Sequence, residues 1–240
     1  MHRKLLELVS MRFAVAIIVL IFAAVFLVAC DSLPEVSEIQ LPFGDSGPDP
    51  CNAGGTLFAD DFSGDQDCGW AEYNRGGAVV DMEGGNLNIS TSSPGEIWWT
   101  NPGRTFDDVI INVTASQLTN VNDNAFGVIC RYQDEQHYYL FLISGDGYYA
   151  IGKYSGTDVP VTYLTPDGQY QFSELINQGI ASNDIQASCI GNQLSLAVNG
   201  EPLLTVTDPE FASGDIGLAA STLQQGTVEV AFDDLRVFAP

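Results

Sequence analysis

Between residues 57 and 240, hydrophobic residues recur at every second position over short stretches. The clearest stretch is 193–198, where Leu194, Leu196 and Val198 alternate with smaller or polar neighbours. Successive side chains of a β-strand point to opposite faces of a sheet, so this period predicts strands with one face in a core. Strands are also expected at 125–132, 137–144, 203–206 and 228–232.

Turn signals separate these stretches at short intervals. Asn199-Gly200 lies between two apolar runs, which is typical of a tight β-hairpin. Further turns are expected at Gly84-Gly85, Gly145-Asp146-Gly147, Pro166-Asp167-Gly168 and Asp208-Pro209. Many short strands punctuated by glycine predict an all-β chain, an antiparallel sandwich or jelly roll, and we expect residues 57–240 to form one such domain.

The N-terminus has a different pattern. His2, Arg3, Lys4 and Arg12 precede an unbroken apolar run at 13–28. This run is shorter than the roughly 18 residues of a membrane-spanning helix, and it fits the apolar part of a secretion signal. We therefore expect residues 1–29 to be a signal peptide, the other interpretation being an uncleaved anchor.

The signal ends in Leu27-Val28-Ala29-Cys30. This resembles the lipobox of bacterial lipoproteins, in which a lipid is attached to the cysteine and the chain is cut just before it. The resemblance implies that Cys30 is lipidated. It also implies that the mature chain is anchored to a membrane outside the cytoplasm, at the cell membrane or cell surface.

Residues 30–56 have the composition of a linker. After Cys30 the segment contains four prolines, several acidic residues and few apolar ones. Such a sequence cannot bury enough apolar surface to fold, so we expect a flexible acidic tether between the lipid and the domain.

The chain carries 31 acidic and 8 basic residues, a formal charge of −23. Cleavage would remove one acidic and three basic residues and leave a formal charge of −25. A surface of this sign repels nucleic acid and anionic lipid, so neither is an expected partner.

Apart from Cys30, four cysteines remain, which predicts two disulfides in an exported protein. Three pairings of Cys51, Cys68, Cys130 and Cys189 are possible. Proximity favours Cys51–Cys68, and the strand context favours Cys130–Cys189.

The order of landmarks along the domain resembles a known fold family. The landmarks are Leu57-Phe58-Ala59-Asp60-Asp61-Phe62, Gly69-Trp70, Gly85-Asn86-Leu87-Asn88-Ile89, the ranges 126–132, 138–141, 146–149, 176–179 and 211–218, Asn199-Gly200, and Phe232-Asp233-Asp234-Leu235-Arg236-Val237. Together they are similar to the concanavalin A-like lectin/glucanase jelly roll, especially its laminin-G-like bacterial members. The resemblance implies a jelly-roll sandwich over about residues 57–239, but this fold hosts lectins, glycosidases and adhesion modules alike.

The sequence lacks the motifs of the catalytic members. Glucanases of this fold carry Glu-x-Asp-x-(x)-Glu on one strand, because retaining hydrolysis needs two carboxyls facing one sugar. The nearest acidic pair, Asp134-Glu135, is expected in a turn, and no Gly-x-Ser-x-Gly is present. We therefore expect a non-catalytic domain.

Sugar binding needs exposed aromatic faces and planar polar side chains. In the doublets Trp98-Trp99, Tyr138-Tyr139 and Tyr148-Tyr149, alternation sends one ring inward and one outward. Candidate ligand-binding residues are Trp99, Tyr139, Tyr149, Arg131 and Lys153. Alternatively, the outward rings only cover the sheet, and the two basic residues pair with nearby aspartates.

The resemblance also implies a structural calcium ion, held by a carboxylate on the last strand and by backbone carbonyls. Asp233 matches the carboxylate position, and Gly85 matches the turn. Hard oxygen ligands of this kind suit Ca²⁺. The alternative is that Asp233 belongs to an ordinary sheet edge.

These features predict a lipid-anchored, extracytoplasmic module whose partner is a glycan or another cell-envelope component. The alternatives are a glycoside-directed hydrolase, similar to the exported 3-keto-glycoside hydrolases, and a structural envelope lipoprotein.

Replacement of Cys30 tests the anchor. We expect labelled palmitate to enter the wild-type chain but not Cys30→Ser, because the thiol is the acyl acceptor. The variant should also leave the membrane fraction. Equal labelling of both chains would contradict the assignment.

Overall fold

The computed structural model describes residues 49–52, 54–156 and 160–240. The predicted signal peptide, Cys30 and most of the tether lie outside these residues. Within the described ranges, no helix is long and apolar enough to cross a membrane.

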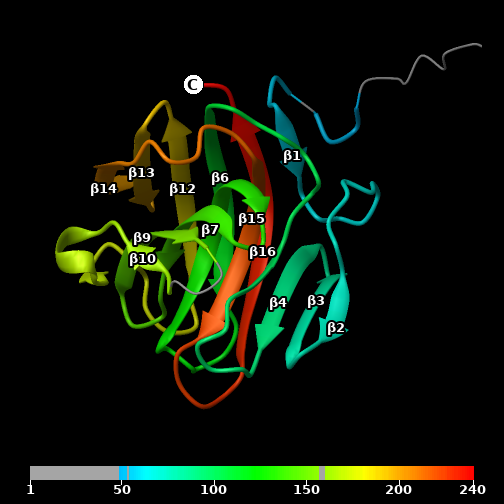
Figure 1. Ribbon diagram of the computed structural model, residues 1–240. Coiled ribbons are helices and arrows are strands. Elements are labelled where there is room, and N and C mark those ends of the chain that lie inside the picture. Colours follow the sequence, from blue (N-terminus) through cyan, green and yellow to red (C-terminus); the bar gives the residue numbers. More distant parts are fainter. Residues whose placement is uncertain (1–48, 53, 157–159) are drawn as a thin grey trace, which may run out of the picture. The chain divides into compact units, whose positions relative to one another are not determined.

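The described chain forms two β-sheets (Figure 1). The nine-stranded sheet has the strand order β14 (Glu201–Thr207), β13 (Gln193–Val198), β12 (Ser182–Ile190), β6 (Val109–Gln117), β16 (Val228–Phe238), β4 (Asn86–Thr91), β3 (Ala78–Glu83) and β2 (Tyr73–Arg75), with β1 (Phe58–Asp60) also paired to β16. The seven-stranded sheet has the order β10 (Thr162–Tyr163), β9 (Tyr148–Ser155), β8 (His137–Ile143), β7 (Asn124–Asp134), β15 (Asp215–Thr222) and β5 (Trp98–Thr100), with β11 (Gln171–Phe172) also paired to β9.

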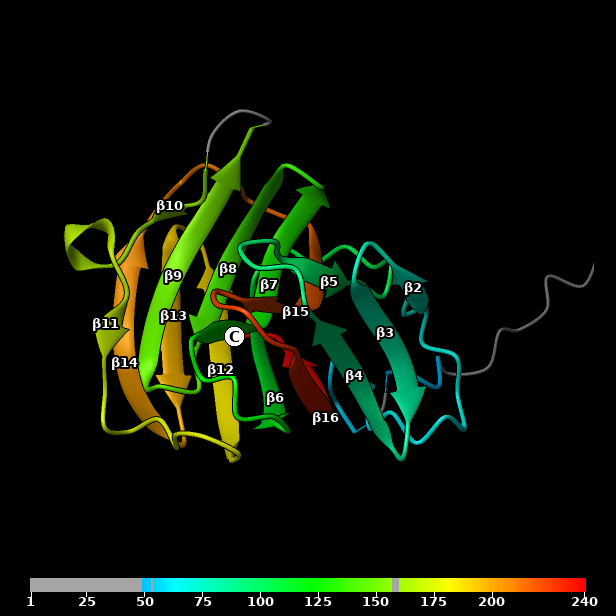
Figure 2. The same ribbon diagram turned by 90° about the horizontal axis from the view of Figure 1, so that it is seen from below.

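The two sheets pack face to face, and Figure 2 shows β9, β8 and β7 side by side in front of β13, β12 and β6. All pairs between these named strands are antiparallel. One short 3₁₀ helix, Pro166–Gly168, interrupts the described strands. The predicted all-β antiparallel sandwich is therefore confirmed.

The predicted hairpin is present between β13 and β14. Asn199 and Gly200 both have positive φ, 55° and 83°, and Val198 pairs directly with Glu201. Two residues with positive φ give a turn whose twist matches that of the strands, which is why Asn-Gly occupies it.

Hydrophobic residues cover both faces of the seven-stranded sheet. The main core lies between the sheets and includes Phe58, Phe141 and Phe232, each fully buried. A second cluster lies on the opposite face, built from Ala125, Ile129, Tyr138, Leu140, Leu142 and Ala219. Strands β8 and β15 are consequently buried along almost their whole length. Antiparallel sheets commonly leave one face to water, whereas the outer face of this sheet carries a hydrophobic cluster.

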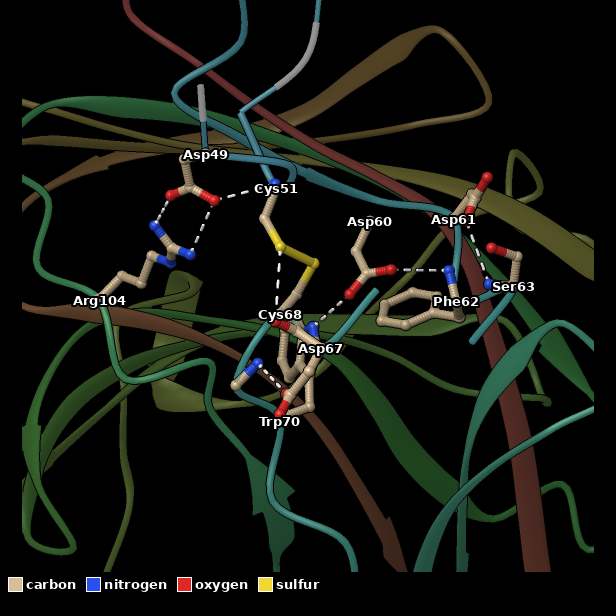
Figure 3. The surroundings of a disulfide bond; sticks show 11 residues. Asp49, Cys51, Asp60, Asp61, Phe62, Ser63, Asp67, Cys68, Trp70 and Arg104 are labelled. Atoms are coloured by element: carbon tan, nitrogen blue, oxygen red, sulfur yellow. Dashed lines mark hydrogen bonds and ion pairs between the residues drawn. A yellow bond between two sulfur atoms is a disulfide. The ribbon is translucent and has the colours of Figure 1, made fainter. Parts of the chain in front are cut away.

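The N-terminal segment is tied to the sandwich (Figure 3). Cys51 is buried and disulfide-bonded to Cys68, and Asp49 forms an ion pair with Arg104. The domain therefore includes Asp49–Asn52, and the boundary predicted at residue 57 is too late. Composition alone misplaced it, because the disulfide and the ion pair order a segment that has few apolar side chains of its own.

A bulge in β7 shapes the sandwich. Its pairing with β8 is regular up to Cys130 and resumes at Asp134, and Arg131 has a φ of 54°. As a result Cys130 and Arg131 both lie between the sheets, where Cys130 is disulfide-bonded to Cys189 of β12. Both predicted disulfides are therefore confirmed, and the second joins the two sheets.

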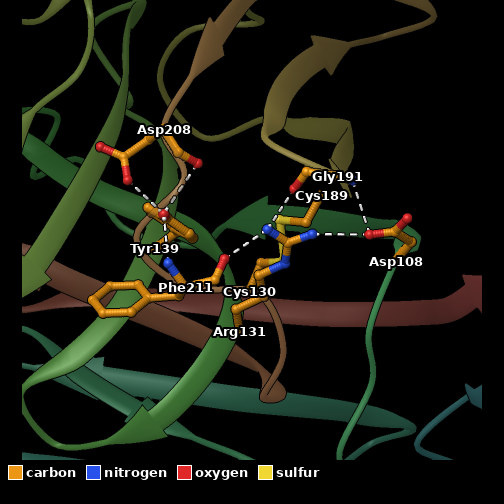
Figure 4. Close-up of polar contacts among 8 residues, drawn as sticks. All are labelled: Asp108, Cys130, Arg131, Tyr139, Cys189, Gly191, Asp208 and Phe211. Carbon is orange, nitrogen blue, oxygen red and sulfur yellow. Dashed lines mark hydrogen bonds and ion pairs between the residues drawn. A yellow bond between two sulfur atoms is a disulfide. The ribbon is translucent and has the colours of Figure 1, made fainter.

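The Arg131 side chain is 2% exposed, and both of its terminal guanidinium nitrogens are hydrogen-bonded (Figure 4). One guanidinium nitrogen donates to the carbonyl oxygens of Gly191 and Phe211 at 2.8 and 2.7 Å. The other donates to Asp108 Oδ1 at 3.0 Å. Gly214 lies against the bulge, since a Cβ there would be 2.5 Å from the Arg131 carbonyl carbon.

The disulfides should contribute unequally to stability. They close segments with sequence separations of 59 and 17 residues. In the loop-entropy model, the loss is about 4 kcal/mol for Cys130→Ala/Cys189→Ala and about 3 kcal/mol for Cys51→Ala/Cys68→Ala. Denaturant unfolding measures both losses, and a larger loss for the shorter loop would contradict the expected order.

Candidate functional site

A groove with a volume of about 1030 Å³ lies on the outer face of the seven-stranded sheet. Its lining comes from β2, β5, β7, β8, β9 and β15 and from the segment that carries β10. The groove therefore lies over the second hydrophobic cluster, on the face of the sheet that is turned away from the main core.

Four aromatic rings cross the groove, one each from β5, β7, β8 and β9: Trp99, Tyr132, Tyr138 and Tyr154. Trp99 lies 5.7 Å from Tyr138 between ring centroids, and Tyr132 lies 5.6 Å from Tyr138. Tyr138 and Tyr154 are nearly parallel at 5.6 Å, with 13° between their planes. We call these four residues the aromatic row.

Strand geometry places the row on one face. In β8, Tyr139, Phe141 and Ile143 join the main core, so Tyr138 must face the groove. Tyr132 reaches this face because the bulge at Arg131 adds a residue before it. Burial raises the pKa of the Tyr138 hydroxyl well above its usual range.

A second aromatic pair stands beside the row. Tyr163 and Tyr170 meet edge to face at 5.0 Å between centroids, and both line the groove. Their segment packs closely on β9, because a Cβ at Gly152 would lie 2.8 Å from a Val161 methyl carbon. Burial and the neighbouring Tyr163 raise the pKa of Tyr170.

The charged groups lie at the ends of the groove. Glu135 comes directly after β7. Tyr132, near the end of β7, pairs with Asp215 at the start of β15. Glu96 follows Pro94, which pairs with Thr222 at the end of β15. Asp215 and Thr222 are seven residues apart along β15. This corresponds to about 23 Å at roughly 3.3 Å per residue.

The structure places the predicted aromatic residues on different faces. Trp99 lines the groove. Tyr139 instead faces the main core, where its hydroxyl donates to Asp208 Oδ1 at 2.6 Å and accepts from the Phe211 N–H at 3.1 Å. Burial and Asp208 raise its pKa to about 12. Tyr149 also packs against the main core. The expectation that Tyr139 and Tyr149 face a ligand is corrected, because alternation in β8 and β9 turns them inward.

Lys153 and Arg131 also lie between the sheets and not in the groove. Lys153 Nζ contacts Asp208 Oδ2 at 2.6 Å and Glu210 Oε2 at 2.5 Å. Burial alone lowers the pKa of Lys153, but these carboxylates outweigh it and raise the pKa. Arg131 pairs with Asp108. Both basic residues follow the alternative of pairing with nearby aspartates, so their predicted role in ligand binding is corrected.

The two residues proposed for calcium lie near each other in register. Phe232 pairs with Leu87, so Asp233 lies toward the β3–β4 turn that contains Gly85. Asp233 Oδ1 accepts a hydrogen bond from the Asp234 N–H at 2.7 Å. The described residues contain no group of three or more His, Cys, Asp or Glu that could hold a metal. A calcium site that also uses backbone carbonyls stays a prediction.

Sequence reasoning missed three members of the row: Tyr132, Tyr138 and Tyr154. Alternation along β8 and β9 would have placed Tyr138 and Tyr154 on the outer face, once one inward-facing residue of each strand is known. For Tyr132, simple alternation gives the wrong face, since the bulge lies between it and the regular part of β7.

Comparison with known proteins supports the fold. No protein-family model matches the chain, and no curated protein matches it. Among solved structures, the β-glucanase of Bacillus licheniformis has a TM-score of 0.56 at 12% identity, covering 78% of this chain and 100% of its own. The carbohydrate-binding module CBM66 of Bacillus subtilis has a TM-score of 0.54 at 13% identity, covering 71% and 96%.

A third similar structure, a Bacillus subtilis protein of unknown function with a galectin-like fold, has a TM-score of 0.52 at 12% identity and covers 77% of this chain and 96% of its own. At these identities, the similarities show the jelly-roll fold alone.

One buried carboxyl fixes the segment that follows Trp99. Asp215 Oδ2 accepts the Gly103 N–H at 2.8 Å, and Asn101 Nδ2 donates to the Ile216 carbonyl oxygen at 2.5 Å. Asp215 is 8% exposed, and burial raises its pKa from 3.8 to about 6.

The raised pKa predicts a dependence of stability on pH. The folded state holds this proton more tightly than the unfolded state, so the contribution is fully present below about pH 4 and is lost as pH rises through 6. The loss is about 3 kcal/mol at 1.36 kcal/mol per pKa unit. We expect the difference in free energy of unfolding between the wild type and Asp215→Asn to decrease by about 3 kcal/mol between pH 4 and pH 7. A difference that does not change with pH would contradict the raised pKa.

Proposed function

We propose that the chain is a lipid-anchored, extracytoplasmic glycan-binding module and that the aromatic row is its ligand platform. The observation that carries the proposal is the row itself: the partly exposed rings of Trp99, Tyr132 and Tyr154, packed around the buried Tyr138, line one groove. This groove lies on a sheet face that has no other layer packed on it among the described residues.

The chemistry of the row suits sugars. The faces of sugar rings present C–H groups, which pack on aromatic rings, while their hydroxyls need polar partners. Asn101 and the tyrosines supply amide and hydroxyl groups along the groove. Ligand pockets usually enclose roughly 300–1,000 Å³, so a groove of about 1030 Å³ has room for an oligosaccharide.

Two of the similar structures carry names of the same kind, a carbohydrate-binding module and a β-glucanase. These names support a glycan as the ligand class. They leave open whether this chain also cleaves its ligand.

The positions of the groove carboxylates favour binding over hydrolysis. Glycosidases hold two carboxyls about 5–5.5 Å apart for retention or about 6.5–9.5 Å apart for inversion. Glu96 and Glu135, the acidic residues of the groove lining, belong to strand ends about 23 Å apart. That separation does not place both on one glycosidic bond.

The anchor in this proposal rests on the lipobox-like motif that ends at Cys30. Several acyl chains on one cysteine give stable membrane attachment. The acidic, proline-containing residues that follow would hold the domain away from an anionic membrane surface, with the groove open to extracellular glycans.

Replacement of a row residue tests the proposal. In the unlipidated mature chain, Trp99→Ala should weaken binding to the best ligand on a glycan array at least about fivefold, since an aromatic contact in an interface contributes about 1 kcal/mol or more. Phe172→Ala is the matched control, because Phe172 is 52% exposed and outside the groove. Binding is measured by calorimetry, and thermal midpoints check folding.

Three results would count against the proposal. Equal affinities of Trp99→Ala and wild type would show that the ligand does not bind in the groove. The absence of any glycan ligand on the array would favour a structural envelope role. Release of reducing sugar would show a hydrolase.

A further inference from the structure

Basic residues are rare in the described chain, and nearly all are paired. Arg104 pairs with Asp49, Arg131 with Asp108, Lys153 with Asp208 and Glu210, and Arg236 with Asp234. Arg75 is the exception: no carboxylate of the described residues lies within ion-pair distance of it. It also lines the groove.

Arg75 is held in position by the groove wall. Its guanidinium carbon lies 4.7 Å from the centroid of the Tyr73 ring, within the range of a cation–π contact. The Tyr73 hydroxyl in turn donates to the Trp99 carbonyl oxygen at 2.8 Å. The strand that supplies a row residue thus also fixes the ring on which the guanidinium rests.

An exposed arginine with no partner is unusual in this chain, because 31 acidic residues compete for 8 basic ones. Guanidinium is a planar fork of donors that binds carboxylate or sulfate oxygens in pairs. Arg75 lines the open groove beside the aromatic row, where its N–H groups would meet a group at the end of a bound sugar chain.

We infer that the ligand carries one anionic group, a carboxylate or a sulfate ester, on the sugar that occupies the Arg75 end of the groove. This inference rests on the proposed glycan-binding function and specifies its ligand class. A single guanidinium offsets a single negative charge. The surplus of acidic groups on the chain repels any further anionic group on the ligand.

Glu96 tunes this subsite. Its N–H donates to the Ser93 carbonyl oxygen at 3.4 Å, and Ser93 Oγ donates to the Gly76 carbonyl oxygen at 3.0 Å. Gly76 follows Arg75 directly, so the Glu96 loop is fixed to the same end of the groove. The Glu96 carboxylate repels an anionic ligand there, and its removal should strengthen binding.

Three probes that share one sugar ring test the inference: methyl β-glucoside, methyl β-glucuronide and methyl β-glucoside 6-sulfate. They are titrated into the unlipidated mature chain, and NMR follows the Trp99 indole N–H and the Arg75 Nε–H. We expect all three to shift the Trp99 signal and only the anionic probes to shift the Arg75 signal. A preference between the two anionic probes identifies a carboxylate or a sulfate ligand.

Variants assign the effect to Arg75. Arg75→Gln should weaken binding of the anionic probes by about tenfold, as expected for one charge-assisted pair, and leave the glucoside unchanged. Arg236→Gln removes an arginine outside the groove and is the matched control, with no change expected. Glu96→Gln should strengthen binding of the anionic probes, and 0.5 M KCl should weaken it.

The outcomes separate the inference from the function on which it rests. Equal affinity for the glucoside and both anionic probes, or no loss in Arg75→Gln, overturns the anionic subsite and leaves glycan binding intact. Failure of all three probes to shift the Trp99 signal overturns the subsite, and together with the absence of any ligand on the glycan array it overturns glycan binding as well.

Discussion

The arrangement of the sandwich depends on a guanidinium buried between its sheets. Arg131 binds two carbonyl oxygens and a carboxylate that come from three different loops. Removing one partner of a buried charge costs far more than the contact itself contributes, because the remaining charge stays desolvated. The contacts of Arg131 therefore stabilise the bulged conformation of the backbone around it. Regular alternation before the bulge points Cys130 at Cys189 in the opposite sheet, and the bulge then returns Tyr132 to the outer face.

The bulge also determines which side chains of β7 reach the outer face of the sheet. A β-strand offers each face every second side chain, and the bulge resets this count inside β7. Tyr132 then joins rings from three other strands, and these rings bury much of each other's surface. Burial raises the pKa of the Tyr132 and Tyr138 hydroxyls. The result is an aromatic platform on a strongly acidic chain, and it is on this platform that the proposed glycan would rest.

The sequence predicted those features that depend on local pattern. Alternation at 193–198, the Asn199-Gly200 turn and an even number of cysteines follow from short-range chemistry, and the structure bears them out. The faces of the aromatic doublets did not follow. Alternation shows that Tyr138 and Tyr139 face opposite ways but not which of them faces inward, since both are apolar enough for a core. That choice depends on the partner strands, as when Asp208 supplies the acceptor that the buried Tyr139 hydroxyl needs.

The basic residues show why rarity alone misleads. Arg131 and Lys153 stood out because an acidic chain has few cations, yet the same excess of carboxylates is the reason that both found internal partners. In such a chain, pairing is the expected state of a cation, whether buried or exposed, and it reports on stability. A cation without a partner is the informative one. Among the described residues, Arg75 has no carboxylate partner and rests instead on the Tyr73 ring. A ring satisfies the charge in part while leaving the planar N–H edge open. This is the arrangement expected of a side chain whose remaining partner arrives with the ligand.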